Sequence, residues 1–144
     1  MNNRYDIAMD KHAAGFNCCT SVLFAFQDKT GLSDEVCYGI SSGLGGGFRT
    51  GGICGAVSAG VIVLGMLHPH NEQTGADGKA SNAKLTQEFQ RRYAEREGAV
   101  DCRDLKPVPA KHEVKWEGRE MKNCDHYILA AVELLEEMIE EYSL

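Results

Sequence analysis

The chain has 144 residues, a length that suits one domain with a single hydrophobic core. Its apolar fraction of 43% is ordinary for a globular protein, and its formal net charge is −6. An acidic chain without a long cluster of lysines and arginines is poorly suited to nucleic acid or anionic membranes, because both need positive charge against phosphate. We therefore expect residues 1–144 to form one domain that binds no nucleic acid.

The N-terminal residues contain no apolar stretch and no small-residue cleavage site, so we expect no signal peptide. The most hydrophobic stretch, residues 53–67, has fifteen residues without a charge, whereas a membrane span needs about twenty. We expect no membrane insertion. Together these features predict a cytoplasmic protein.

Apolar residues recur at helical spacing through almost the whole chain, which predicts an all-α fold. The first predicted helix covers residues 5–13, and Gly15 interrupts the pattern after it. Asn17 can cap a second helix that ends at Gly31, and Ser33 can cap a short third one. The N-terminal part is thus expected to hold three helices.

Residues 43–52 contain six glycines, and Gly disfavours a helix by about 1 kcal/mol per position relative to Ala. This glycine-rich segment therefore predicts no regular element. It matches no nucleotide-binding motif, because no Gly-Lys-Ser/Thr follows it and no strand precedes it. Two interpretations stay open: the loop brings backbone N–H groups up to a cysteine sulfur or a cluster, or it is a flexible connector.

The helix predicted over residues 53–68 is apolar on all sides, which indicates burial at the centre of the fold. A polar loop over 69–78 and a helix ending near Gly98 come next. Residues 99–117 are predicted to form an ordered connector, and 119–142 the last helix. We predict a single-domain bundle of five or six helices around the helix at 53–68.

Six cysteines are a high number for a chain of this length: Cys18, Cys19, Cys37, Cys54, Cys102 and Cys124. In a reducing compartment such a number favours metal binding or redox chemistry over a disulfide framework. The chain has no C-x-x-C motif, so the common thioredoxin, zinc-ribbon and ferredoxin spacings are absent. Any site must be assembled by tertiary packing from distant segments.

Three cysteines are placed near predicted helix starts. Cys18 follows a cap, Cys54 opens the central helix, and Cys124 lies in the early turns of the last helix. A helix N-terminus stabilises a thiolate, the form that attacks disulfides and binds metals. Cys102 lies in an irregular segment, where the following Arg103 can favour the anion. The alternative is structural, because free cysteines are often small buried hydrophobes, and this alternative fits Cys124 and Cys37 well.

The cysteines and their flanking residues resemble a known family. The match begins with GFNC at residues 15–18 and continues through the glycine-rich segment into CGAVSAG at residues 54–60. It then takes in CRDL at residues 102–105 and ends with Cys124. In these features the chain resembles the redox-active proteins named for their C_GCAxxG_C_C pattern. One departure is that the last glycine of the motif falls on Ala59, with Gly60 one place later.

The resemblance implies a redox role and a link to transport or metal handling. It marks four cysteines as the catalytic thiolate site, and as ligands if a metal is bound: Cys18, Cys54, Cys102 and Cys124. Two forms of the site stay open. The thiolates ligate an iron–sulfur cluster or another metal for electron transfer, or they form reversible disulfides. Three glycines are predicted to line such a cofactor: Gly51, Gly52 and Gly55.

A second hypothesis is a non-catalytic metal-binding or accessory protein linked to transport, with a structural zinc site on the cysteines. Its partner would be a redox or transport protein, or a second copy in a homodimer. The last helix offers an acidic face for such a contact and an apolar seam: Met121, Cys124, Ile128, Ala131, Leu135, Met138 and Tyr142. We favour the interpretation that this seam faces the domain's own core. Cys19 and Cys37 lie outside the family pattern and are predicted to be structural.

Overall fold

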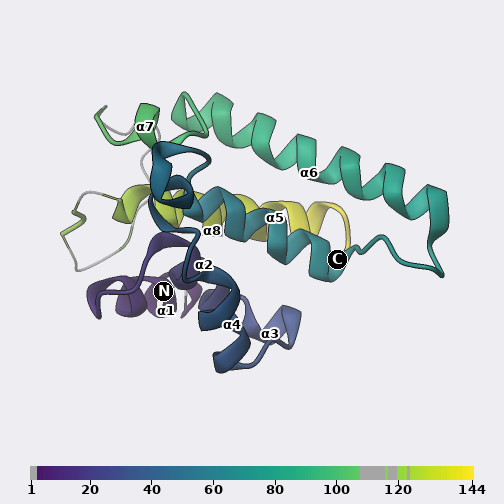
Figure 1. Ribbon diagram of the computed structural model, residues 1–144, viewed down its shortest axis with the longest axis horizontal. Coiled ribbons are helices and arrows are strands. Elements are labelled where there is room, and N and C mark those ends of the chain that lie inside the picture. The colour runs from purple at the N-terminus through teal and green to yellow at the C-terminus, as the bar shows by residue number, and fades with distance from the viewer. Residues whose placement is uncertain (1–2, 108–115, 117–119, 123) are drawn as a thin grey trace.

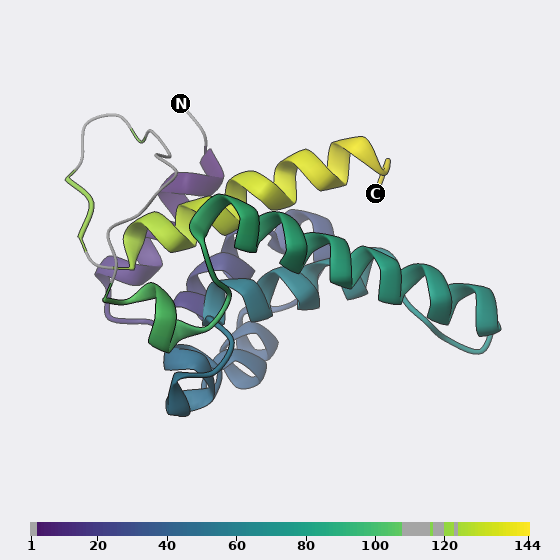
Figure 2. The ribbon, with the colours of Figure 1, turned by 90° about the horizontal axis from the view of Figure 1, so that it is seen from above.

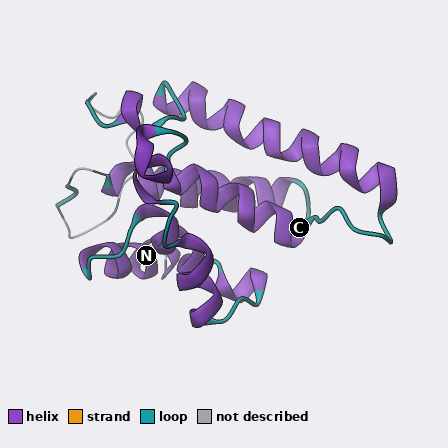
Figure 3. Cartoon of the chain, viewed as in Figure 1, coloured by secondary structure: helices purple, strands orange, loops and turns teal. Residues whose placement is uncertain are grey.

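The computed structural model describes residues 3–107, 116, 120–122 and 124–144, and all regular structure within these ranges is helical (Figures 1 and 3). The all-α prediction is confirmed. Six helices have eight residues or more: α1 (Asn3–Ala13), α2 (Cys18–Ala25), α4 (Asp34–Ser41), α5 (Gly55–Leu67), α6 (Gly75–Glu97) and α8 (Asp125–Glu141). Three short segments lie between them: α3 (Gln27–Thr30), the wide turn η1 (Gly47–Gly51) and α7 (Cys102–Leu105).

Two helices share the centre of the fold. The predicted central helix is present as α5, which packs against α2, α6 and α8 (Figure 2). Helix α8 is equally central, since every residue from 126 to 132 is buried. Four members of the predicted apolar seam are fully buried in the same core: Ile128, Ala131, Leu135 and Met138. These four side chains face the domain itself, while Tyr142 is 43% exposed.

Helices α5 and α6 approach closely at Gly60, where a Cβ would collide with the ring of Phe89. Ala59, which stands where the family motif ends, is fully buried beside it. The close approach therefore depends on Gly60, one position later than the last glycine of the motif.

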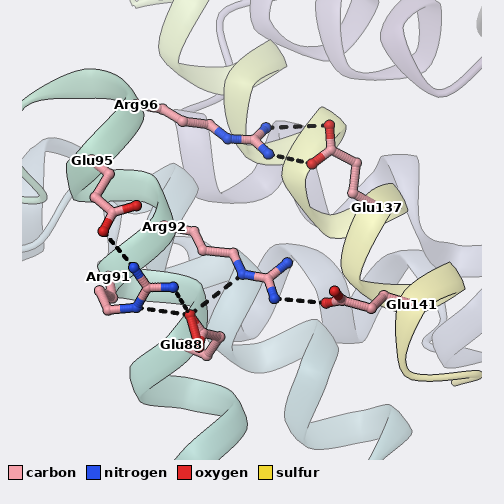
Figure 4. Close-up of polar contacts among 7 residues, drawn as sticks. All are labelled: Glu88, Arg91, Arg92, Glu95, Arg96, Glu137 and Glu141. Atoms are coloured by element: carbon pink, nitrogen blue, oxygen red, sulfur yellow. Dashed lines mark hydrogen bonds and ion pairs between the residues drawn. The ribbon is translucent and has the colours of Figure 1, made fainter.

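Ion pairs join α6 to the acidic face of α8 (Figure 4). The guanidinium of Arg92 lies 2.7 Å from a carboxylate oxygen of Glu141. Arg96, one turn later in α6, pairs with Glu137, one turn earlier in α8. Such partly exposed pairs stabilise a fold by about 0–1 kcal/mol each. Part of the acidic face of α8 is thus turned toward α6.

Several predicted boundaries differ from the structure. The second helix ends at Ala25 and α3 follows, because Phe26 adopts a non-helical φ of −120° and is fully buried. The last helix begins at Asp125, where the Asp125 carboxylate accepts a 2.8 Å bond from the N–H of Lys122. Its predicted start at Arg119 lies outside the described residues, as do residues 108–115 and 117 of the predicted connector. Within the described residues no helix is both long and apolar enough to cross a membrane.

Candidate thiol site

All four cysteines of the predicted site stand at helix starts. Cys18 is the first residue of α2, and Cys54 and Cys124 come immediately before α5 and α8. The prediction that Cys102 lies in an irregular segment is wrong, because Cys102 opens the short helix α7. Sequence reasoning missed this turn because four residues are too few for a recognisable period.

Backbone hydrogen bonds hold the segments of Cys54 and Cys102 side by side. The N–H of Cys54 donates to the carbonyl of Val100 over 2.7 Å, and the N–H of Cys102 donates to Gly52 over 2.7 Å. These bonds flank an isolated antiparallel bridge between Ile53 and Asp101. The two helix starts are therefore fixed to each other although they are far apart in sequence.

Cys18 and Cys54 form a hydrogen-bonded pair, in which the Cys54 thiol donates to Cys18. Gly55 makes this approach feasible, because a Cβ there would collide with the Cys18 Sγ and would lie 3.0 Å from the Leu44 carbonyl oxygen. Helices α2 and α5 thus meet at a sulfur atom, across a glycine that leaves room for it.

The surroundings of Cys18 favour its anion. The hydrogen bond from Cys54 and further bonds from the backbone N–H groups of Gly46, Cys19 and Ala56 outweigh burial and lower the pKa of Cys18 to about 6. Gly46 belongs to the glycine-rich segment and has a left-handed φ of 62°. This agrees with the interpretation that the loop brings an N–H group up to a cysteine sulfur.

The surroundings of Cys54 favour its protonated form. Its hydrogen bond to Cys18, its burial and the negative charge on Cys18 all raise the pKa of Cys54 well above the usual value. Only 7% of Cys54 is exposed. Of the two thiols, Cys18 is therefore the one that ionises more readily.

Cys124 lies within electrostatic reach of the other site cysteines. Burial is the main cause that raises the pKa of Cys124, and the negative charges of Cys18 and Cys102 add to it, while Lys106 opposes them. Cys102 itself is buried. The charges of Cys18 and Cys102 thus act on Cys124, whereas the hydrogen-bonded approach is shown for Cys18 and Cys54.

The three glycines predicted to line a cofactor have structural contacts. Gly51 has a φ of 77° and packs against Arg103, and its carbonyl oxygen accepts a 2.9 Å hydrogen bond from the Arg103 Nε. The N–H of Gly52 donates a hydrogen bond to the carbonyl of Gly47, and the carbonyl of Gly52 accepts one from the N–H of Cys102. Together with Gly55, these residues hold the cysteine segments together. A role in cofactor binding stays a prediction.

The donor set gives no direct support to a metal centre. Among the described residues, no three His, Cys, Asp or Glu side chains are grouped so that they could hold a metal ion. The side chains as placed do not fit a metal or an iron–sulfur cluster, so both stay predictions from sequence, and we derive no chemical step through either.

Cys19 and Cys37 are fully buried between α2 and α4. Burial, with a contribution from the charges on Cys18 and Cys37, raises the pKa of Cys19 to about 12. Burial and the charge of Asp34 likewise raise the pKa of Cys37. Buried thiols of this kind are chemically inert, in agreement with the predicted structural role.

One buried polar pair was not predicted from the sequence. The Oε2 atom of Glu97 lies 3.0 Å from the Nε2 atom of His126, and both side chains are buried. In the sequence, His126 lies two residues after Cys124, a spacing that turns two side chains of a helix away from each other. The available signal was a charged residue one turn after Tyr93, on the buried face of α6.

The fold and site define a class: a small all-helical protein with cysteines at helix starts and a hydrogen-bonded thiol–thiolate pair. Residues 16–138 match the family described as "Putative redox-active protein (C_GCAxxG_C_C)", and the chain belongs to this family. The matched range contains all four cysteines of the site, so the resemblance seen in the sequence is confirmed. No curated protein and no solved structure gives a match.

Proposed function

We propose that the protein exchanges disulfides with a redox partner, with Cys18 as the attacking thiolate and Cys54 as the resolving thiol. The observation that carries this proposal is the hydrogen bond from Cys54 to a Cys18 sulfur whose pKa is lowered to about 6. Membership of a redox-active family agrees with it. In the cytoplasm, the location that we propose, reducing partners would regenerate the thiols.

The reaction proceeds in two exchanges. The Cys18 thiolate attacks one sulfur of the partner's disulfide, which forms a mixed disulfide and releases the partner's first thiolate. Cys54 loses its proton and attacks the Cys18 sulfur, which forms the Cys18–Cys54 disulfide and releases the second thiolate. Two electrons pass from the protein to the partner, and the reverse sequence reduces the protein.

Cys102 and Cys124 are proposed to take part in a further exchange. This extension is supported by the charges of Cys18 and Cys102, which both act on Cys124. We expect a disulfide formed at Cys18 to be passed to this second pair by a further thiol–disulfide exchange. In a Cys124→Ser variant we expect the disulfide to stay between Cys18 and Cys54.

The test equilibrates the reduced protein with glutathione and glutathione disulfide at several ratios, followed by acid quenching, alkylation and peptide mass spectrometry. We expect a peptide linked through Cys18 and Cys54. The matched Cys54→Ser variant should instead accumulate glutathione on Cys18. Absence of the Cys18–Cys54 link at every ratio would contradict the proposal.

A further inference from the structure

The glycine-rich segment closes into a wide turn with an unusual backbone. The N–H of Gly52 donates a 2.8 Å hydrogen bond to the carbonyl of Gly47, which closes η1. Inside the turn, Phe48 and Arg49 have φ values of 60° and 61°, in the left-handed region. A Cβ makes this conformation unfavourable, and residues held in it are concentrated at binding and switch sites. Two such residues therefore call for a functional explanation.

Side chains that leave this turn are exposed. Phe48 is 56% exposed, the largest fraction for a large apolar side chain among the described residues. Ile53, which follows the closing residue Gly52, is 39% exposed, and Arg49 is exposed on the same turn. Aromatic residues and arginine are enriched at interfaces between proteins. The exposed residues of the turn thus have the composition of a contact surface.

A second arginine joins the turn from α7. The Nε of Arg103 donates a 2.9 Å hydrogen bond to the carbonyl of Gly51, and the Arg103 side chain is exposed. Arg49 donates a 3.0 Å hydrogen bond to the carbonyl of Ser42. Backbone oxygens therefore hold both guanidinium groups at the turn. We define the η1 surface as the four exposed residues gathered here: Phe48, Arg49, Ile53 and Arg103.

The two arginines of the η1 surface have no acidic partner among the described residues. Asp104 follows Arg103 in the chain but forms no ion pair with it. The arginines of α1 and α6 are different, because each pairs with carboxylates: Arg4 with Asp28, Arg91 with Glu88 and Glu95, Arg92 with Glu141, and Arg96 with Glu137. In a protein with a net charge of −6, the η1 surface is thus a local site for a negatively charged partner.

The η1 surface lies beside Cys18. A Cβ on Gly55 would collide with the Cys18 Sγ and would lie 3.0 Å from the carbonyl oxygen of Leu44, so the sulfur and this oxygen are neighbours. The same Leu44 oxygen accepts a 3.5 Å hydrogen bond from the N–H of Phe48. Cys18 itself is partly exposed. A protein whose disulfide reaches Cys18 therefore meets the η1 surface as well.

We propose that the η1 surface docks the redox partner through an acidic segment that carries an apolar side chain next to the partner's disulfide, an inference that rests on the proposed disulfide exchange. Carboxylates of this segment pair with Arg49 and Arg103, and its apolar side chain covers Phe48 and Ile53. The left-handed backbone fixes Phe48 and Arg49 at the surface before the partner arrives, which reduces the entropy lost on docking.

The test compares two peptides of opposite charge. Each peptide has a leucine next to one cysteine, flanked by two aspartates or by two lysines, and the cysteine is linked to thionitrobenzoate. When the Cys18 thiolate attacks the peptide sulfur, a disulfide forms between them and thionitrobenzoate leaves as a coloured thiolate. The same mixed disulfide made with mercaptoethanol carries no peptide, so it measures the reactivity of Cys18 itself. Mass spectrometry identifies the cysteine that has reacted.

At low ionic strength we expect the aspartate peptide to react with the wild-type protein about tenfold faster than the lysine peptide, because charge complementarity speeds association. The net charge of −6 acts in the opposite direction, since it attracts the lysine peptide. The preference should shrink at high salt, where exposed charges are screened. Equal rates for the two peptides, or a faster reaction of the lysine peptide, would overturn the inference.

Variants assign the preference to the η1 surface. The readout is the rate with the aspartate peptide divided by the rate with the mercaptoethanol disulfide. This ratio should fall by about tenfold when Arg49→Gln and Arg103→Gln are combined, because the cations that attract the aspartates are lost. It should also fall in Phe48→Gly, where glycine suits the left-handed backbone and only the apolar ring is lost.

Two matched controls lie elsewhere on the molecule. Arg91→Gln removes an exposed arginine that pairs with Glu88 and Glu95 on α6 (Figure 4). Met66→Gln removes an apolar side chain that is 45% exposed, near the end of α5 that lies away from Cys54. Both controls should keep the wild-type ratio. A wild-type ratio in the Arg49→Gln and Arg103→Gln combination and in Phe48→Gly would overturn the inference.

The proposed function and the docking inference fail in different ways. A wild-type Cys18 that reacts with neither the peptides nor the mercaptoethanol disulfide would overturn the proposed exchange. Reaction at Cys18 without a preference for the aspartate peptide would overturn the docking inference alone. If circular dichroism shows that the arginine variant does not fold, Phe48→Gly and the comparison of the two peptides on the wild-type protein still decide the matter.

Discussion

Cys18 and Cys19 occupy the first two positions of α2 and face different parts of the fold. Around Cys18 lie the Cys54 thiol and backbone N–H groups from three segments, which lower its pKa to about 6. Around Cys19 lie the buried side chains between α2 and α4, and its pKa rises to about 12.

This difference shows that a helix start alone does not make a thiol reactive. Both residues belong to the first turn of one helix and experience nearly the same helix dipole. Their side chains point about 100° apart, so one meets hydrogen-bond donors and the other meets apolar packing. The predictions that follow test this contrast, beginning with the largest effect.

Selective alkylation should separate the two neighbours by several orders of magnitude. At pH 7 iodoacetamide should label Cys18 and leave Cys19 unmodified, because only the thiolate reacts and the two pKa values are about 6 and about 12. Since the pKa of Cys18 is lowered, its labelling rate should rise as pH increases through about 6 and then level off. Peptide mass spectrometry measures both sites, and a midpoint near the usual thiol pKa of ~8.5 would contradict the prediction.

Removal of the Cys54 donor should bring Cys18 closer to an ordinary thiol. In Cys54→Ala the alkylation midpoint of Cys18 should move from about 6 toward ~8.5, which reduces its labelling at pH 7 by about tenfold or more. The matched control is Cys37→Ala, which removes a buried thiol beside Cys19 and should leave the midpoint of Cys18 in place. An unchanged midpoint in Cys54→Ala would show that the backbone donors suffice.

A methyl group at Gly55 should damage the site and the fold together. In Gly55→Ala the new Cβ collides with the Cys18 Sγ, and we expect a loss of about 1–3 kcal/mol in the free energy of unfolding. Gly65→Ala, in the same helix but with no atom near its added Cβ, should be neutral or stabilise by up to about 1 kcal/mol. Urea denaturation compares them, and equal stability of the two variants would mean that α2 and α5 do not meet at Gly55.

The smallest effect is expected at the cap of α2. Asn17 accepts a 2.9 Å bond from the N–H of Thr20 and donates a 3.0 Å bond to Ser41, so Asn17→Ala should destabilise the protein by about 1 kcal/mol. Ser33→Ala removes the exposed cap of α4 and should cost less, because Ser33 accepts a longer bond of 3.2 Å from Val36. Thermal unfolding followed by circular dichroism ranks the two variants, and a reversed order would contradict the prediction.

Local patterns were sufficient to predict much of the fold. The caps at Asn17 and Ser33 are present, and so is the helix end at Gly98, whose φ of 93° is left-handed. The apolar residues of α5 correctly indicated a buried helix. These features depend on residues within one or two turns, which a single sequence displays directly. The break at Phe26 was missed because it depends on burial of the ring by distant helices.

The sequence by itself determined that the chain is helical, which cysteines match the family pattern, and that Cys18, Cys54 and Cys124 lie near helix starts. Tertiary structure decided which thiols meet. The pairing of Cys18 with Cys54, the burial of Cys19 and the contact of Glu97 with His126 all join segments far apart in the chain. Hydrogen bonding and desolvation set the pKa of a thiol, and both depend on atoms that only folding brings within a few ångströms.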